Sequence, residues 1–119
     1  PTFLDMTGLA GDSKHNADMD GFSLVPLLKN PTAKLKRQAL YWHYPHYYPT
    51  TTPVSAVRQG DWKLLEYFED NHIELYDLSN DIGEQNDLAE KMPEKAEELR
   101  NRLDSWRKTV NAQMPTNNT

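Results

Sequence analysis

The 119-residue sequence contains no cysteine, which excludes disulfide bridges, thiolate metal sites and cysteine nucleophiles. It also lacks any apolar run near the roughly 18 residues that a membrane-spanning helix needs. Basic residues are in the minority, 13 against 18 acidic ones, and the net charge of -5 gives no electrostatic footprint for nucleic acid. We therefore expect a soluble chain with neither nucleic acid nor a membrane as its partner.

Motifs of catalysis are missing as well. The sequence has no G-x-S-x-G, no glycine-rich loop that could hold a phosphate, and no serine in an obvious histidine and aspartate setting. By their own chemistry, these residues predict no catalytic centre within the chain.

The first 37 residues contain little periodic pattern. "PTFLDMTGLAG", residues 1–11, is typical of the end of a helix closed by Gly8 or Gly11 in a left-handed cap. We expect this stretch to be the end of a helix from a preceding domain, in a longer polypeptide. Residues 12–37 are predicted to be a linker, with an exposed loop over residues 12–21 and a short helical turn at "SLVPLL" with Ser23 as its N-cap.

From residue 38 the apolar period becomes two. The runs "QALYWHY", "VSAVRQ", "DWKLLEYF" and "HIELYDL" are short, rich in aromatic and β-branched residues, and bounded by turn residues. Gly60 between the second and third runs favours a tight hairpin, and residues 69–72 supply the next reversal. The pattern predicts a meander of four antiparallel strands with one face packed and the other facing water.

The last predicted element is a long amphipathic helix over residues 92–110. Apolar residues recur there at steps of four and three: Met92, Ala96, Leu99, Leu103, Trp106 and Val110. A coiled coil is the alternative, but the stripe is shorter than three heptads and the sheet has a face to cover. The expected fold class is therefore α+β, a small four-stranded antiparallel sheet packed against a long C-terminal helix, over residues 38–119.

The segment "YWHYPHYYP", residues 41–49, concentrates five aromatic rings and two imidazoles. His43 and His46 form an H-x-x-H, but three positions along a strand point to opposite faces, Pro45 interrupts them, and no third ligand follows at a fixed spacing. The favoured interpretation is a strand with alternating faces, followed by a proline-bounded loop that exposes His46, Tyr47 and Tyr48. Aromatic faces exposed in this way suit stacking against a sugar.

A second candidate is the acidic stretch "DLSNDIGEQNDL", residues 77–88. Its carboxylates do not follow the alternating register of an EF-hand calcium loop, so a solvated turn is the favoured interpretation. No metal site is expected in this chain.

Five sequence motifs follow one another in an order that is typical of one protein family. They are "MDGFSLVPLL", "ALYWHYPHY", the hairpin "AVRQGDWKLLEY", then "ELYDLSNDIGEQNDLA", and "AQMPT" near the end. Read together, they resemble the C-terminal subdomain of type I, formylglycine-dependent sulfatases of the arylsulfatase kind, with the hairpin and the E-L-Y-D-L stretch the most specific. Ile82 stands where the family usually has proline and Asp87 where it usually has asparagine, both in a turn.

The resemblance implies a hydrolase of sulfate esters whose formylglycine and calcium ion belong to a larger N-terminal α/β domain, so Lys63 is not expected to be a catalytic lysine. It makes that catalytic domain the partner of this chain and a sulfated glycan the substrate, with His43, Tyr44, His46 and Tyr47 as candidates for leaving-group recognition. A periplasmic or secreted location is implied as well. If the face that meets the catalytic domain is bare, we expect self-association through it.

Two other interpretations stay open from the residues alone. One is a free-standing sugar-binding or interaction module. The other is the same subdomain attached to a phosphodiesterase or phosphonate hydrolase of the alkaline phosphatase superfamily, whose catalytic domain is related.

Overall fold

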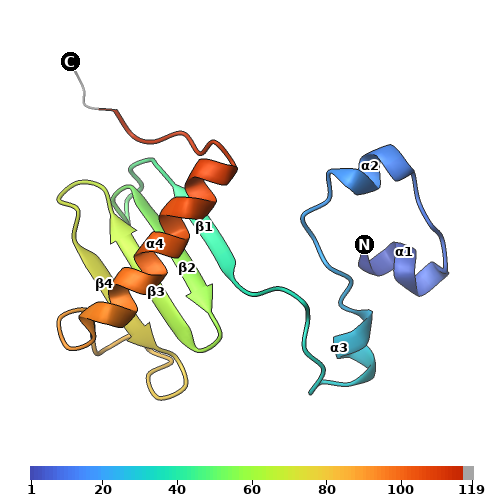
Figure 1. Cartoon of the computed structure of the whole chain (residues 1–119), viewed down its shortest axis with the longest axis horizontal. Coiled ribbons are helices and arrows are strands. Elements are labelled where there is room, and N and C mark those ends of the chain that lie inside the picture. Colours follow the sequence, from blue (N-terminus) through green and yellow to red (C-terminus); the bar gives the residue numbers. More distant parts are fainter. Residues whose placement is uncertain (117–119) are drawn as a thin grey trace. The chain divides into compact units, whose positions relative to one another are not determined.

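The computed structural model describes residues 1–116, and the chain divides into two compact units at Arg37 and Gln38 (Figure 1). The N-terminal unit holds three short helices, α1 (Thr2–Thr7), α2 (Ser13–Ala17) and α3 (Val25–Lys29). The sheet-and-helix unit, from Gln38 onward, holds four strands and one long helix, α4 (Pro93–Thr109).

In the N-terminal unit, α1 ends in the left-handed glycine cap that the sequence predicted. Gly8 follows the helix with φ 68°, and its N–H donates to the carbonyls of Leu4 and Asp5. A residue with a side chain is strained at this backbone angle, whereas glycine adopts it freely. The helix therefore closes at the first of the two candidate glycines.

Two expectations for this unit were wrong. Residues 12–21 do not form a loop throughout, because α2 begins after Asp12, whose carboxylate accepts a 2.8 Å hydrogen bond from the backbone N–H of His15. Such capping is enough to hold one short helical turn. Ser23 is not the N-cap of α3, which is Leu24, although the Ser23 hydroxyl accepts a hydrogen bond from the Val25 N–H at 3.2 Å.

The sheet is the predicted meander. Strands β1 (Leu40–Tyr44), β2 (Val54–Gln59), β3 (Trp62–Tyr67) and β4 (Ile73–Asp77) lie in chain order, and each pairs antiparallel with the next. The β2–β3 hairpin turns through Gly60 and Asp61, with Gly60 at φ 60°. Asn71, also at φ 60°, reverses the chain between β3 and β4. Both turns fall where the sequence places them.

Helix α4 covers one face of the sheet, as expected, and packs on β2, β3 and β4 (Figure 1). Its side chains meet alternate residues of the strands because the period of a strand is two. The resulting core of buried residues consists of Ala39, Val57, Leu64, Leu75, Ala96, Leu99 and Leu103. The fold class is thus α+β, a four-stranded antiparallel sheet packed against a long C-terminal helix.

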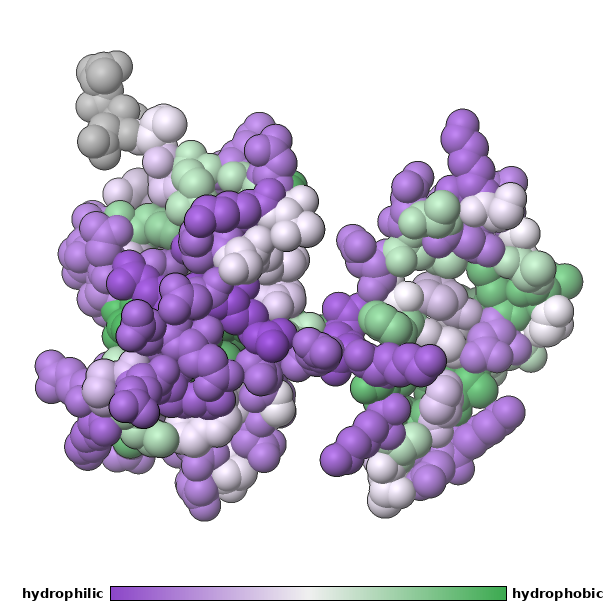
Figure 2. Space-filling model, viewed as in Figure 1, coloured by the Kyte–Doolittle hydropathy of each residue, from purple (hydrophilic) through white to green (hydrophobic). Residues whose placement is uncertain are grey.

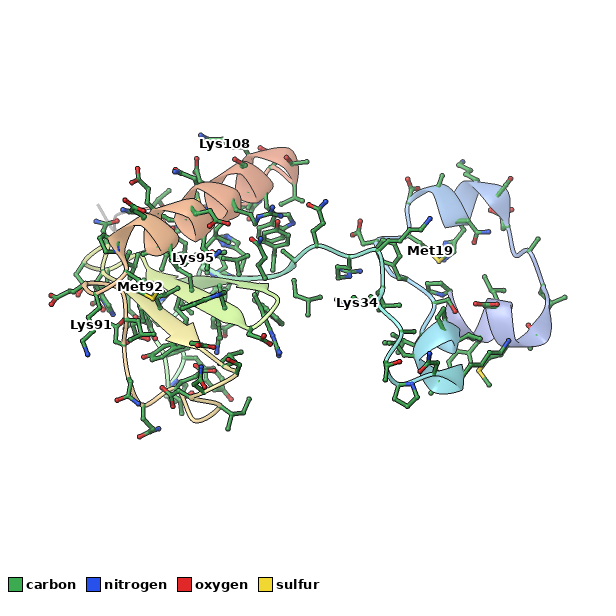
Figure 3. The ribbon with its side chains drawn as sticks, turned by 60° about the horizontal axis from the view of Figure 1, so that its bottom comes forward. Met19, Lys34, Lys91, Met92, Lys95 and Lys108 are labelled. Carbon is green, nitrogen blue, oxygen red and sulfur yellow. The ribbon has the colours of Figure 1, made fainter. Side chains whose placement is uncertain are left out.

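The ends of the predicted stripe on α4 lie outside the core. Met92 is 38% exposed and Val110 is 50% exposed, whereas Arg107, which was not in the predicted stripe, is buried. The two lysines near the ends of the helix differ: Lys95 lies over the Trp62 ring, and Lys108 is 76% exposed at the far end (Figure 3). Polar residues accordingly dominate the surface of this unit on the side of α4 (Figure 2).

The opposite face of the sheet has a partly polar cover. The Tyr67 hydroxyl donates to Glu74 Oε2 at 3.2 Å, and Lys63 Nζ pairs with Glu84 at 2.7 Å. Burial, and then the neighbouring Glu74 carboxylate, raises the pKa of both Tyr67 and Tyr76 to about 12. Both phenols therefore stay neutral at physiological pH. Among the helices of residues 1–116, none has the length and apolar character to cross a membrane.

Candidate functional site

Strand β1 sends its side chains to the two faces of the sheet in alternation, as predicted. Tyr41 and His43 lie on the face covered by α4, and the Tyr41 ring stacks on Trp106 with ring centres 4.8 Å apart. Trp42 and Tyr44 lie on the other face and are 51% and 41% exposed. The strand therefore separates the members of the aromatic segment.

His43 is half-buried and engaged through both ring nitrogens. Its Nδ1 lies 2.6 Å from the hydroxyl of Ser55, the residue paired with it on β2, and its Nε2 lies 2.7 Å from the carbonyl oxygen of Gln113. Phe68 approaches the ring edge-on, with centres 5.8 Å apart. His43 thus joins the sheet to the segment that follows α4.

The loop after β1 spans residues 45–53 and closes on itself. Tyr48 and Thr51 exchange backbone hydrogen bonds of 3.0 and 3.1 Å, which forms an isolated bridge. His46 packs edge-on against Tyr44 at 5.6 Å, and Tyr47 is 69% exposed. Three prolines restrict the backbone of this loop and its exit, so the exposed rings of His46, Tyr47 and Tyr48 are held on a stiff backbone.

A groove of about 650 Å³ lies between this loop and the chain after α4. We call it the His46 groove. It is lined by Pro45, His46, Tyr47, Pro53, Phe68, Glu69, Gln113, Met114, Pro115 and Thr116. It combines aromatic faces, an imidazole, an amide and one carboxylate, so it can stack against a ring and hydrogen-bond polar substituents.

The four predicted site residues do not form one surface. His46 and Tyr47 line the His46 groove, whereas His43 and Tyr44 do not. Tyr44 supports His46 from the outer face of the sheet, and His43 contacts the groove wall at Phe68 and Gln113. The wall formed by residues 113–116 was missed, since nothing in its local sequence indicates that it returns to β1.

A second cluster, also missed, surrounds the buried carboxylate of Glu66. Its Oε1 accepts a 2.8 Å hydrogen bond from Arg100 Nε, and its Oε2 lies 2.7 Å from a terminal nitrogen of Arg107. The side chains of Glu66 and Arg107 are only 6% and 9% exposed. The Arg107 contact is short but poorly aligned, because Oε2 has no hydrogen bond of good geometry within the described residues.

This cluster borders a second hollow of about 530 Å³, which extends along α4 from Pro93 to Arg107. The sequence contains a signal for the cluster: Glu66 follows buried Leu64 by two positions on β3, and Arg107 follows buried Leu103 by four on α4. Since each positive charge here has an acidic neighbour, the cluster serves to bind α4 to the sheet.

The acidic stretch 77–88 uses its carboxylates to hold the turn. Asp77 accepts hydrogen bonds from Ser79 and Asn80, and Asp81 accepts them from the backbone N–H groups of Gln85 and Asn86. These hydrogen bonds lower the pKa of both carboxyls below the usual 3.8. Within residues 1–116, no three His, Cys, Asp or Glu side chains are grouped so that they could hold a metal ion.

The comparisons with known proteins fit this architecture. Residues 1–110 match the family described as N-sulphoglucosamine sulphohydrolase, C-terminal. The chain belongs to this family. The sulfatase C-terminal domain recognised in the motifs is therefore confirmed over nearly the whole sequence.

Among curated relatives, a sulfatase of Formosa agariphila is 32% identical over 89% of this chain and 21% of its own length. The Delta 4,5-hexuronate-2-O-sulfatase of Bacteroides thetaiotaomicron is 36% identical over 75% of this chain and 18% of its own. This member of the family thus spans about a fifth of the length of the curated relatives it matches.

Solved structures of sulfatases have the same fold as this chain over part of their length. A 2-O GAG sulfatase superposes with a TM-score of 0.75 at 30% identity, covering 94% of this chain and 24% of that one. A protein solved with its substrate D-glucosamine-2-N,6-O-disulfate gives a TM-score of 0.71 at 31% identity, covering 97% and 24%. The sheet-and-helix architecture is therefore that of a sulfatase C-terminal domain.

Proposed function

We propose that this chain is the C-terminal part of a sulfatase, a hydrolase of sulfate esters, and that its His46 groove recognises the alcohol portion of a sulfated glycan. The family match and the relatives named sulfatases support the reaction class. The placement of His46 and Tyr47 together in the groove is the observation that carries the recognition role.

The chemistry of the reaction gives such a groove its purpose. The sulfate group is common to all substrates of a sulfatase, so discrimination comes from contacts to the alcohol. The Tyr47 ring offers a face for a pyranose, and His46 offers a hydrogen bond to a hydroxyl group. The groove would then act on selectivity, while the catalytic domain supplies the rate.

Formylglycine and calcium, which the family resemblance implies for the complete enzyme, do not fit the described residues. The chain has no cysteine and no serine in the C/S-x-P-S-R motif that the resemblance implies for formylglycine, its acidic turn uses its carboxylates for hydrogen bonds, and residues 1–116 present no set of metal ligands. We place both groups in a separate N-terminal catalytic domain, which we propose as the partner of this chain. A periplasmic or secreted location follows from the same proposal.

The face of strand β1 that points away from α4 offers a surface for that partner. Leu40, Trp42 and Tyr44 on β1 are 40%, 51% and 41% exposed and project from the same side of the strand. We propose that this side contacts the catalytic domain. The 119-residue chain alone should then self-associate, and light scattering at rising concentration that shows only monomer would contradict this expectation.

The recognition role is tested in the complete sulfatase with two substrates, glucosamine 6-sulfate and the small aryl ester 4-nitrophenyl sulfate. Replacing His46→Ala should lower kcat/KM for the sugar about tenfold and leave that for the aryl ester near its original value. Tyr47→Ala should act in the same direction, with Tyr47→Phe as the matched variant that keeps the ring. Equal losses on both substrates would refute the recognition role.

The groove also favours a second candidate function, since it lies wholly within residues 38–116. A free-standing sugar-binding module would bind glucosamine 6-sulfate measurably as the 119-residue chain alone, by titration calorimetry.

The other alternative concerns the reaction of the complete enzyme. Hydrolysis of a phosphodiester or phosphonate ester in preference to both sulfate esters would assign it to the phosphodiesterases or phosphonate hydrolases of the alkaline phosphatase superfamily.

A further inference from the structure

The segment after α4 forms one wall of the His46 groove, and few interactions hold it in place. Asn111, which follows the C-cap residue Val110, has φ 49°, and the Ala112 N–H donates to the carbonyl of Arg107 at 2.9 Å. Beyond that point, within residues 1–116, a side chain of the sheet forms a hydrogen bond to the segment through His43 Nε2 and the Gln113 carbonyl, 2.7 Å long and joining residues 70 positions apart. The position of Gln113 and Met114 in the groove therefore depends on His43.

The partners of His43 fix the tautomer of its neutral ring. A carbonyl oxygen can only accept a hydrogen bond, so the proton must be on Nε2. In the neutral ring Nδ1 is then an acceptor, and the hydroxyl of Ser55 donates to it at 2.6 Å. Because Ser55 is only 1% exposed, this hydroxyl needs a partner inside the protein. Both bonds together determine the orientation of the imidazole.

Neither ring nitrogen of His43 remains available to a ligand. We propose that His43 is a positioning residue of the groove, which holds the 113–116 wall opposite His46 and Tyr47 and does not itself touch the substrate. This inference rests on the proposed recognition role of the groove. It assigns different tasks to two histidines that stand three positions apart.

Two substitutions at position 43 distinguish the contact made by Nδ1 from the contact made by Nε2. The amide of His43→Asn reaches the place of Nδ1 and can still pair with Ser55, but has no atom at the place of Nε2. The amide of His43→Gln reaches farther and brings an N–H near the place of Nε2, where it can donate to the Gln113 carbonyl. The pair therefore tests the contact with Gln113 while a polar group is kept at position 43.

The first measurement uses the 119-residue chain. In His43→Asn, exchange of the Ala112 amide should accelerate about tenfold, and the Met114 methyl signal should move toward its value in an unfolded peptide. In His43→Gln both should stay close to the original. Urea unfolding of the two variants, followed by tryptophan fluorescence, reports whether the core is intact. Equal loosening of the segment in both variants would overturn the proposal.

The second measurement uses the complete sulfatase and the ratio of kcat/KM for glucosamine 6-sulfate to that for 4-nitrophenyl sulfate. We expect His43→Asn to lower this ratio about fivefold and His43→Gln to restore it. If His43 contacts the sugar directly, both variants lose selectivity while Ala112 and Met114 behave as in the original, which overturns the proposal. Failure of the recognition role itself is distinguished by His46→Ala, which would then leave the ratio unchanged.

Discussion

The two units of this chain follow one another directly in the sequence but are stabilised by different interactions. None of residues 1–37, all of which the structure describes, is buried, and Phe3, Leu9 and Leu28 are 83%, 64% and 67% exposed. From Gln38 onward, by contrast, Val57, Leu64, Leu75, Leu99 and Leu103 are completely shielded from solvent. Hydrophobic residues are thus present in both units but form a core in only one.

The difference arises from the length and period of the elements. The three helices of the N-terminal unit have five or six residues each, too short to present an extended apolar face. The 17 residues of α4 present several buried positions in succession to a sheet whose strands do the same. Local hydrogen bonds hold the first unit, whereas burial of apolar surface holds the second.

The largest expected effect comes from the core. Leu64→Ala removes a fully buried side chain at the centre of β3, and should lower the free energy of unfolding of the sheet-and-helix unit by about 3 kcal/mol, through lost burial and the cavity left behind. Leu28→Ala removes the same atoms from an exposed position and should cost less than about 0.5 kcal/mol. Urea unfolding followed by tryptophan fluorescence measures both. Similar costs would contradict the contrast between the units.

The next effect comes from the charged cluster beneath α4. Arg107→Ala leaves the Glu66 carboxylate buried with only Arg100 beside it, and should destabilise the unit by about 2 kcal/mol. Lys108→Ala, one position along the helix, removes an exposed ion pair with Asp104 and should change stability by less than about 0.5 kcal/mol. Thermal unfolding of the two variants provides the measurement, and an equal change in both would show that burial of the pair does not matter.

Where the sequence predicted the structure well, many residues repeated one signal. Four alternating runs predicted the strands, and the stripe of Ala96, Leu99 and Leu103 predicted α4. The same alternation correctly assigned Tyr41 and His43 to one face of β1. Where a single side chain decided the outcome, as with Asp12 at the start of α2, the pattern was too short to indicate a helix.

The candidate site was harder to predict for a related reason. The exposure of His46 and Tyr47 follows from local sequence, because Pro45 ends the strand before them. The opposite wall of the groove depends on a contact between His43 and Gln113, across 70 positions, and no local pattern encodes such a contact. Contacts between residues that are distant in the sequence are therefore the part of the site that local sequence patterns do not predict.

A smaller effect should separate two glycines that share a backbone angle. Gly60 at φ 60° and Gly8 at φ 68° both have open space around the position of a Cβ, so alanine costs only conformational strain at either site. Gly60→Ala should destabilise the sheet-and-helix unit by about 1 kcal/mol, whereas Gly8→Ala should leave its unfolding unchanged. Denaturation curves of both variants test this. A loss in Gly8→Ala equal to that in Gly60→Ala would mean that the two units unfold together.

The smallest effect concerns acid, because the turn that follows β4 depends on ionised carboxylates. Hydrogen bonds to Asp77 and Asp81 hold their pKa values below the usual 3.8, so the stability that they contribute is present above about pH 4 and is lost as the pH falls through the lowered values. The melting temperature of the 119-residue chain should therefore decline as the pH falls below about pH 4. Asp81→Asn should start lower at neutral pH but decline less steeply, since it has no carboxylate at position 81 to protonate. A decline as steep as that of the original chain would show that the acid sensitivity of the sheet-and-helix unit comes from other groups, such as Asp70 and Asp104, whose pKa values are also lowered by hydrogen bonds.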